Sequence, residues 1–217
     1  RITLAVAAGA VLVSAMAGAV MGLIAGYSGG WIDNVLMRIV DLTMAFPILL
    51  LALVLLYVFG PSMQNVIIVL GVVRWPLFAR LARVRTLSIR QEEYILAACA
   101  VGCRPARILF RHILPNALTP LLVLATLEVS ANILTESTLS FLGMGIQPPN
   151  ASWGLMLAAG KEYMLASPWL ITIPGLAIFI TVLCINLFGT WLRSLSDPLQ
   201  GKRLMTGVWL AKSVSKT

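Results

Sequence analysis

Charged residues are scarce in this chain. Only 11% of its 217 residues are charged and 59% are hydrophobic, whereas a soluble domain is typically about one quarter charged. Residues 2–28 and 42–73 contain no charged side chain, and about 20 apolar residues in a helix are enough to span the hydrocarbon of a bilayer. This scarcity excludes an ordinary soluble domain and indicates a membrane protein.

Cysteine is also scarce. Three cysteines, an odd number, do not form the framework of a small disulfide-linked protein. Cys99 and Cys103 stand one helical turn apart near His112, the single histidine, but a tetrahedral metal site needs a fourth ligand. We therefore expect reduced thiols and no metal bound by this chain.

Signals for catalysis or nucleic-acid binding are missing as well. The sequence shows no pairing of a nucleophile with a base and no phosphate-binding glycine loop. The net charge of +8 comes from basic residues that lie between apolar segments, without interleaved aromatic residues or a DNA-binding motif. We expect neither an enzyme nor a nucleic-acid partner.

The apolar runs are expected to be helices, because backbone groups in hydrocarbon need internal hydrogen bonds and the alternation typical of barrel strands is absent. Small residues in the first run favour close helix packing. The chain begins with Arg1 rather than Met, so we expect a sixth helix upstream. The predicted fold class is all-α, a polytopic transmembrane bundle with five visible helices at about residues 2–27, 35–59 (with Pro47 inside), 62–85, 115–142 and 168–192.

Turns and loops separate these helices. Gly29-Gly30 and Asp33-Asn34 predict the first turn, and residues 150–166 are expected to form a semi-polar connection. Cytoplasmic loops of membrane proteins carry the excess of Lys and Arg. We therefore expect the loop of residues 86–114 and the tail of residues 194–217 on the cytoplasmic side, and the loop of residues 143–167 on the outer side. The membrane domain is predicted to cover residues 1–193. The basic residues behind this orientation are Arg38, Arg80, Arg83, Arg85, Arg90, Arg104, Arg107, Arg111, Arg193, Lys202, Arg203, Lys212 and Lys216.

The loop of residues 86–114 holds the most specific pattern. Residues 92–101 have helical composition, Gly102 is suited to end that helix in a left-handed conformation, and residues 105–110 can start another short helix. Pro115 is suited to the first turn of the next membrane helix. The sequence therefore predicts a helix–glycine–helix elbow at the membrane surface; the alternative is a basic helix lying on anionic lipid.

The run YILAACAVG (residues 94–102), followed by Ile108 and HILPN (residues 112–116), resembles the EAA loop of ABC-importer permeases. The run RHILPN is similar to the dipeptide, oligopeptide and nickel branch, as are GYSGGW (26–31), FP (46–47), WP (75–76), SFLG (140–143), QPP (147–149) and SWG (152–154), in that order. The chain thus resembles a C-type permease subunit of a type I ABC importer. In that family the loop docks on an ATPase subunit.

This resemblance implies partners and coupling residues. The partners would be a second, homologous permease, two ABC ATPase subunits that bind ATP and Mg, an extracytoplasmic substrate-binding protein and the lipid of a prokaryotic cytoplasmic membrane. Leu96 replaces the acidic residue that names the motif, so the polar contact of that residue is either absent or supplied by Glu92 or Glu93. The coupling residues implied are Glu93, Leu96, Ala97, Ala98, Gly102, Ile108, His112, Leu114 and Pro115.

Polar residues within the predicted helices form a second candidate site. Glu128, Asn132, Thr135 and Glu136 fall on one side of the fourth helix, and acids in membranes normally face a bundle interior or a water-filled path. A translocation path and hydrogen bonding between helices remain equally open. An unpaired Arg74 in mid-membrane would cost at least ~2.5 kcal/mol, so its partner is expected among Glu136, Glu128 and Asp41. Arg38 and Asp41 are predicted to form a local pair.

On the outer side, Pro148, Pro149 and Trp153 are candidates for a re-entrant loop that contacts the receptor, or for a plain interfacial loop. The function predicted is a permease subunit that forms half of a path for di- or oligopeptides. An ion-coupled secondary transporter or a channel is the alternative, and nickel or glutathione are alternative substrates.

Overall fold

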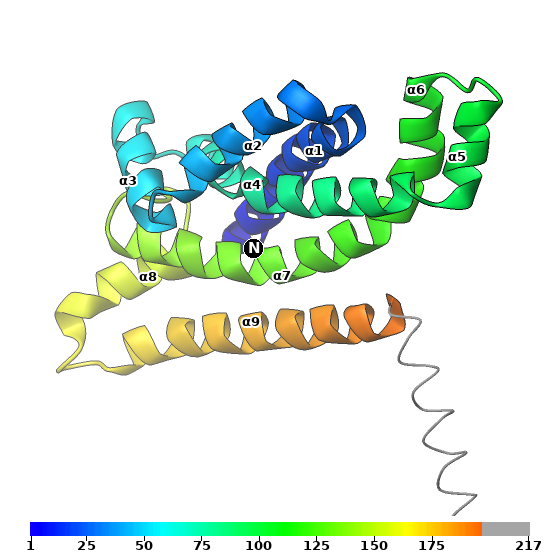
Figure 1. Cartoon of the computed structure of the whole chain (residues 1–217). Coiled ribbons are helices and arrows are strands. Elements are labelled where there is room, and N and C mark those ends of the chain that lie inside the picture. Colours follow the sequence, from blue (N-terminus) through cyan, green and yellow to red (C-terminus); the bar gives the residue numbers. More distant parts are fainter. Residues whose placement is uncertain (197–217) are drawn as a thin grey trace, which may run out of the picture.

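Helices make up the computed structural model, which describes residues 1–196 (Figure 1). No β-strand occurs within that range. The predicted tail of residues 194–217 lies outside the described residues from position 197 onward. The helices are α1 (Ile2–Ser28), α2 (Gly30–Met44), α3 (Ile48–Phe59), α4 (Met63–Arg90), α5 (Glu93–Ala100), α6 (Pro105–Arg107), the π-helical η1 (Ile108–Ile113), α7 (Leu114–Phe141), α8 (Trp153–Gly160), the 3₁₀-helical η2 (Lys161–Tyr163) and α9 (Trp169–Ser196).

Four stretches of the described chain are long and apolar enough to cross a membrane: α1, α4, Pro105–Phe141 and α9. The pair α2 and α3 would make a fifth span if it crosses as one, although the two helices are bent by 89° relative to each other. The predicted single helix at residues 35–59 is therefore wrong. Pro47 has no N–H and disfavours helical backbone at the residue before it, so α2 ends at Met44 and α3 begins after Pro47.

The predicted turn before this helix is also too long. Helix α2 already begins at Gly30, directly after Gly29, so Asp33 and Asn34 lie inside it. The helix dipole favours an aspartate in the first turn of a helix, which explains why Asp33 continues the helix instead of interrupting it.

Helices α1 and α4 pack with their backbones close together. Gly18, Gly22 and Gly26 follow one another at four-residue spacing along α1, and a Cβ added at any of them would collide with α4. At Gly22 the added atom would lie 2.7 Å from the Cβ of Ala82. Glycine is required here because the neighbouring helix occupies the space of a side chain, as the small-residue composition predicts.

Helix α7 joins the parts of the bundle. It packs on α1, α4, α8 and α9, and in Figure 1 α9 runs beside it while α8 lies near its end. The predicted connection at residues 150–166 thus contains a helix, α8, whose N-terminus is capped by the Ser152 hydroxyl accepting from the Leu155 N–H at 3.2 Å.

The predicted start of the fourth membrane helix near Pro115 is confirmed, because α7 begins at Leu114 and Pro115 lies in its first turn. Helix α7 also follows α6 and η1 without a break, so residues Pro105–Phe141 form one continuous helical stretch. Immediately before Pro115, η1 has π geometry, in which the Leu114 N–H reaches the Leu109 carbonyl. Proline removes one backbone donor, and the wider π turn is where this helix departs from α geometry.

Candidate functional site

The coupling elbow, as we name residues 93–113, lies at one end of the bundle. It connects α4 to α7 and lies at the opposite end of α7 from α8 (Figure 1). Gly102 has φ +79°. The Cys103 N–H donates to the Ala98 carbonyl and the Gly102 N–H to the Cys99 carbonyl, which is a Schellman motif. The predicted helix–glycine–helix geometry is present.

A small hydrophobic core holds the coupling elbow together. Ile95, Ile108 and Ile113 are fully or almost fully buried and cluster with Leu23 of α1. Burying one such side chain stabilises a fold by about 1.5–3 kcal/mol. The Arg90 guanidinium next to the elbow also donates to the Tyr27 carbonyl at 2.9 Å. The elbow is therefore fixed to the end of α1 and does not hang as a free loop.

Three large apolar side chains of the elbow are exposed. The exposed fraction is 57% for Leu96, 85% for Val101 and 61% for Phe110. The sequence singled out Leu96 but not Val101 or Phe110, because apolar residues are common everywhere in this chain. Exposed apolar clusters rimmed by polar residues are typical of protein interfaces.

The predicted coupling residues divide into two groups. One group is exposed and available to a partner: Glu93, Leu96, Ala97, Gly102 and Pro115. The other is buried or half-buried and supports the elbow from within: Ala98, Ile108, His112 and Leu114. In this second group the His112 carbonyl accepts from the Asn116 amide at 2.7 Å, and that amide also donates to the Tyr94 hydroxyl at 3.2 Å.

The buried polar seam, as we name Arg74, Glu128, Asn132, Thr135 and Glu136, consists of four residues of α7 and Arg74 of α4. Arg74 forms an ion pair with Glu128 at 2.6 Å and donates to the Thr135 hydroxyl at 3.0 Å. Glu128 is therefore the partner of Arg74, and not Glu136 or Asp41. Both charged residues are buried, and they lie near the middle of two helices of 28 residues each.

The half of the seam that is farther from the coupling elbow has fewer hydrogen-bond partners. Glu136 and Asn132 are fully buried. One Glu136 oxygen accepts from Ser140 at 2.6 Å, while its second oxygen and both polar atoms of the Asn132 amide have no hydrogen-bond partner. The hydroxyls of Ser152 and Thr3 lie around the same carboxyl group. Through Thr3 and Ser152, the Glu136 carboxyl group thus connects α7 to the start of α1 and to the N-terminal cap of α8.

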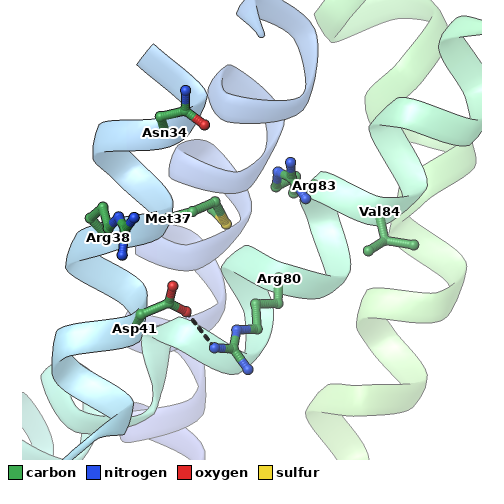
Figure 2. A pocket seen from close by; sticks show the side chains of 7 residues that line it. All are labelled: Asn34, Met37, Arg38, Asp41, Arg80, Arg83 and Val84. Carbon is green, nitrogen blue, oxygen red and sulfur yellow. Dashed lines mark hydrogen bonds and ion pairs between the residues drawn. The ribbon is translucent and has the colours of Figure 1, made fainter. Parts of the chain in front are cut away.

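Two further ion pairs join α2 to α4. Asp41 accepts from Arg80 at 2.6 Å, and Asp33 accepts from Arg83 through two bonds of 2.5 and 2.6 Å. The predicted local pair of Arg38 with Asp41 is wrong, because Asp41 turns toward α4 (Figure 2). Spacing along one helix does not reveal a stronger partner on a neighbouring helix.

The candidate receptor residues differ in exposure. Pro148 and Pro149 are exposed in the segment between α7 and α8. Trp153 is half-buried, packs against the cluster of Ala7, Ile133 and Ile178, and donates its backbone N–H to the Thr3 hydroxyl at 3.3 Å. The prolines are therefore open to a partner, whereas Trp153 holds the segment against the bundle.

Curated relatives and solved structures resemble this chain over most of its length. It is 43% identical over 198 residues to the dipeptide transport system permease protein DppC of Alkalihalophilus pseudofirmus, covering 91% of this chain and 65% of that protein. It is 43% identical to the glutathione transport system permease protein GsiD of Pectobacterium atrosepticum (91% and 66% covered) and 40% identical to the probable D,D-dipeptide transport system permease protein DdpC of Escherichia coli (88% and 64%). The chain thus spans about 65% of the length of these relatives.

A solved structure of the MetNI methionine ABC transporter in an inward-facing conformation has the same fold, with a TM-score of 0.67 at 21% identity, over 90% of this chain and 94% of that one. Residues 18–202 match the family described as binding-protein-dependent transport system inner membrane component. This match covers most of the chain and includes α4, the coupling elbow and α7. The chain belongs to that family of inner-membrane transport components.

Proposed function

We propose that this chain is a permease subunit of an ATP-binding-cassette importer and forms half of a translocation path for peptides. The observation that carries the proposal is the coupling elbow, a rigid unit that buries Ile95, Ile108 and Ile113 within itself while it exposes Leu96, Val101 and Phe110. A soluble partner gains about 25 cal/mol for each Å² of apolar surface it covers. Two ATPase subunits, which bind ATP and Mg, are the partners proposed for this surface and its copy on a second permease.

The elbow is also positioned to pass a movement into the membrane. Helix α4 leads into it and α7 leads out of it, and the same two helices are joined in mid-membrane by the pair of Arg74 with Glu128. A displacement of the elbow must therefore either move α4 and α7 together or separate a buried ion pair. We propose that the seam keeps α4 and α7 together, so that the movement of the ATPases on closing is transmitted through the elbow to the helices of the translocation path.

The position of basic residues supports a cytoplasmic elbow. Arg85, Arg104, Arg107 and Arg111 lie on or beside the elbow, and cytoplasmic segments of membrane proteins carry the excess of Lys and Arg. In this orientation Pro148 and Pro149 lie on the outer side, where a substrate-binding protein would deliver the solute.

The peptide substrate is inferred from the relatives, whose names specify dipeptides, D,D-dipeptides and glutathione. All three are small peptidic solutes. The seam residues are buried inside the subunit: Glu128, Asn132, Thr135, Glu136 and Arg74. We propose that they support the helices that line the path and contact the solute only after α7 moves.

Uptake into membrane vesicles tests this function. The purified complex, reconstituted with its receptor, should accumulate a labelled dipeptide when ATP is supplied and should contain a nucleotide-hydrolysing subunit. An ion-coupled transporter would instead accumulate the dipeptide under a proton or sodium gradient without ATP, and that result would refute the proposal.

A further inference from the structure

A cleft of about 400 Å³ opens between α2 and α4 (Figure 2). The coupling elbow and the polar seam contribute nothing to it. Its lining is unusually basic for a surface that runs along membrane helices. The side chains that matter are Met37, Arg38 and Asp41 on α2 and Arg80, Arg83 and Val84 on α4.

One cation of this cleft has no acidic partner. Arg80 is paired with Asp41 and Arg83 with Asp33. Three arginines thus face two aspartates, which leaves one positive charge. Among the residues that the structure describes, no acidic group lies within ion-pair distance of Arg38. The cleft is therefore complementary to a ligand with a single negative charge.

The depth of the cleft matches the headgroup region of a bilayer. Arg80 and Arg83 follow Met63, the first residue of α4, by 17 and 20 residues, which places them about 26 and 30 Å along the helix at a rise of 1.5 Å per residue. The hydrocarbon core is about 30 Å thick. If α4 enters the hydrocarbon at Met63, these arginines reach its far boundary, at the level of lipid phosphates.

The surroundings of the cleft are apolar and exposed. Val84, which lines the cleft, is 57% exposed, and Leu42, the neighbour of Asp41 on α2, is 66% exposed. A headgroup bound in the cleft would thus have acyl chains beside it that cover these side chains. A free inorganic ion would leave them uncovered, which favours a lipid over a small anion.

We propose that this cleft binds the phosphodiester of an anionic phospholipid of the phosphatidylglycerol class. Arg38 supplies the unmatched charge, and Arg80, which uses one nitrogen for Asp41, retains further N–H donors for a second phosphate contact. The planar guanidinium matches phosphate geometry, and basic pockets between membrane helices are known to take such headgroups. A zwitterionic lipid carries its own ammonium group and leaves the excess charge unbalanced.

The test compares arginines at the same end of the bundle. Arg38→Gln removes the unmatched cation and leaves both ion pairs intact, while Arg85→Gln removes an exposed arginine that does not line the cleft. Phosphatidylglycerol and phosphatidylcholine are titrated separately into the delipidated complex, and the retained lipid is counted by native mass spectrometry. The loss of one charge-assisted contact predicts about tenfold weaker phosphatidylglycerol binding in Arg38→Gln, and no change in Arg85→Gln.

Arg38→Lys keeps the charge without the planar fork and should bind with intermediate strength, provided thermal unfolding shows all variants folded. Equal binding by Arg38→Gln and the unchanged protein, or equal binding of the two lipids, would overturn the proposal. Displacement by millimolar inorganic phosphate would make this a free-anion site, and displacement by a dipeptide would make it part of the solute path; either result refutes the lipid assignment. Lipid binding is measured without transport, so a negative result in this test would leave the proposed permease function unaffected.

Discussion

Arg74 of α4 and Glu128 of α7 are 54 residues apart in sequence and form an ion pair of 2.6 Å in the interior of the bundle. The coupling elbow occupies the chain between them. Any rearrangement that separates α4 from α7 must expose or leave unpaired two desolvated charges, which is costly. The pair therefore holds together the two helices that enter and leave the elbow.

Removing one member of this pair should destabilise the protein far more than removing both. Arg74→Gln leaves Glu128 buried without its cation, and such losses cost about 3–5 kcal/mol. The double variant Arg74→Gln with Glu128→Gln leaves no buried charge and should recover most of that loss. Thermal unfolding of the four proteins in one detergent measures the coupling. Additive effects of the two single substitutions would contradict a direct pair.

Close contact of α1 with α4 predicts a sharp difference between two glycines of α1. An added Cβ at Gly22 meets the Ala79 backbone and the Cβ of Ala82, which cannot give way, whereas at Gly9 it meets only the side chain of Ile67 at 3.3 Å. Gly22→Ala should destabilise by about 1–3 kcal/mol or more through overpacking, while Gly9→Ala should be tolerated. The measurement is the unfolding midpoint of the purified proteins. Equal midpoints would show that the helices do not meet at Gly22.

Several parts of this structure could be predicted because they depend on local composition. The long apolar runs gave α1, α4 and α9, and Gly102 ended α5 because a left-handed residue is needed there. The free-energy cost of an unpaired cation in the membrane predicted an acidic partner for Arg74, and Glu128 was among the candidates.

Other parts depend on contacts between distant segments. The 89° bend at Pro47 could not be told from a mild kink, since membrane helices often tolerate proline. The partner of Asp41 lies on another helix, so spacing within α2 pointed to the wrong arginine. Helix α8 was missed because eight apolar residues carry little periodicity; the capping position of Ser152 was the available signal.

Gly102 offers a test of elbow geometry without a steric confound. Its φ is +79° and an added Cβ would meet nothing within 4 Å, so only the backbone conformation limits the side chain. Asparagine tolerates the left-handed region and valine does not. Gly102→Asn should therefore retain most ATP-driven uptake, and Gly102→Val should lose most of it while the protein still reaches the membrane in normal amounts. Similar uptake by both variants would show that the elbow geometry is not needed.

Two adjacent residues separate docking from folding. Leu96 is exposed, whereas Ile95 is fully buried in the elbow core. Leu96→Ser should leave the unfolding midpoint unchanged but reduce the copurifying ATPase about tenfold, since covering a leucine contributes roughly 1.5–3 kcal/mol. Ile95→Ser should lower the midpoint itself. Full ATPase recovery with Leu96→Ser would exclude this side chain from the interface.

The native cysteines provide the most direct test of a docked elbow. Cys99 is exposed on α5 and Cys184 is exposed on α9, so each, left as the single thiol by serine substitution of the other two, can carry the same photoreactive maleimide. After illumination of membranes that contain the assembled transporter, we predict a crosslink from Cys99 to a nucleotide-hydrolysing subunit and none from Cys184. ATP-driven peptide uptake by a complex in which Cys99 captures no such subunit would contradict the proposed coupling.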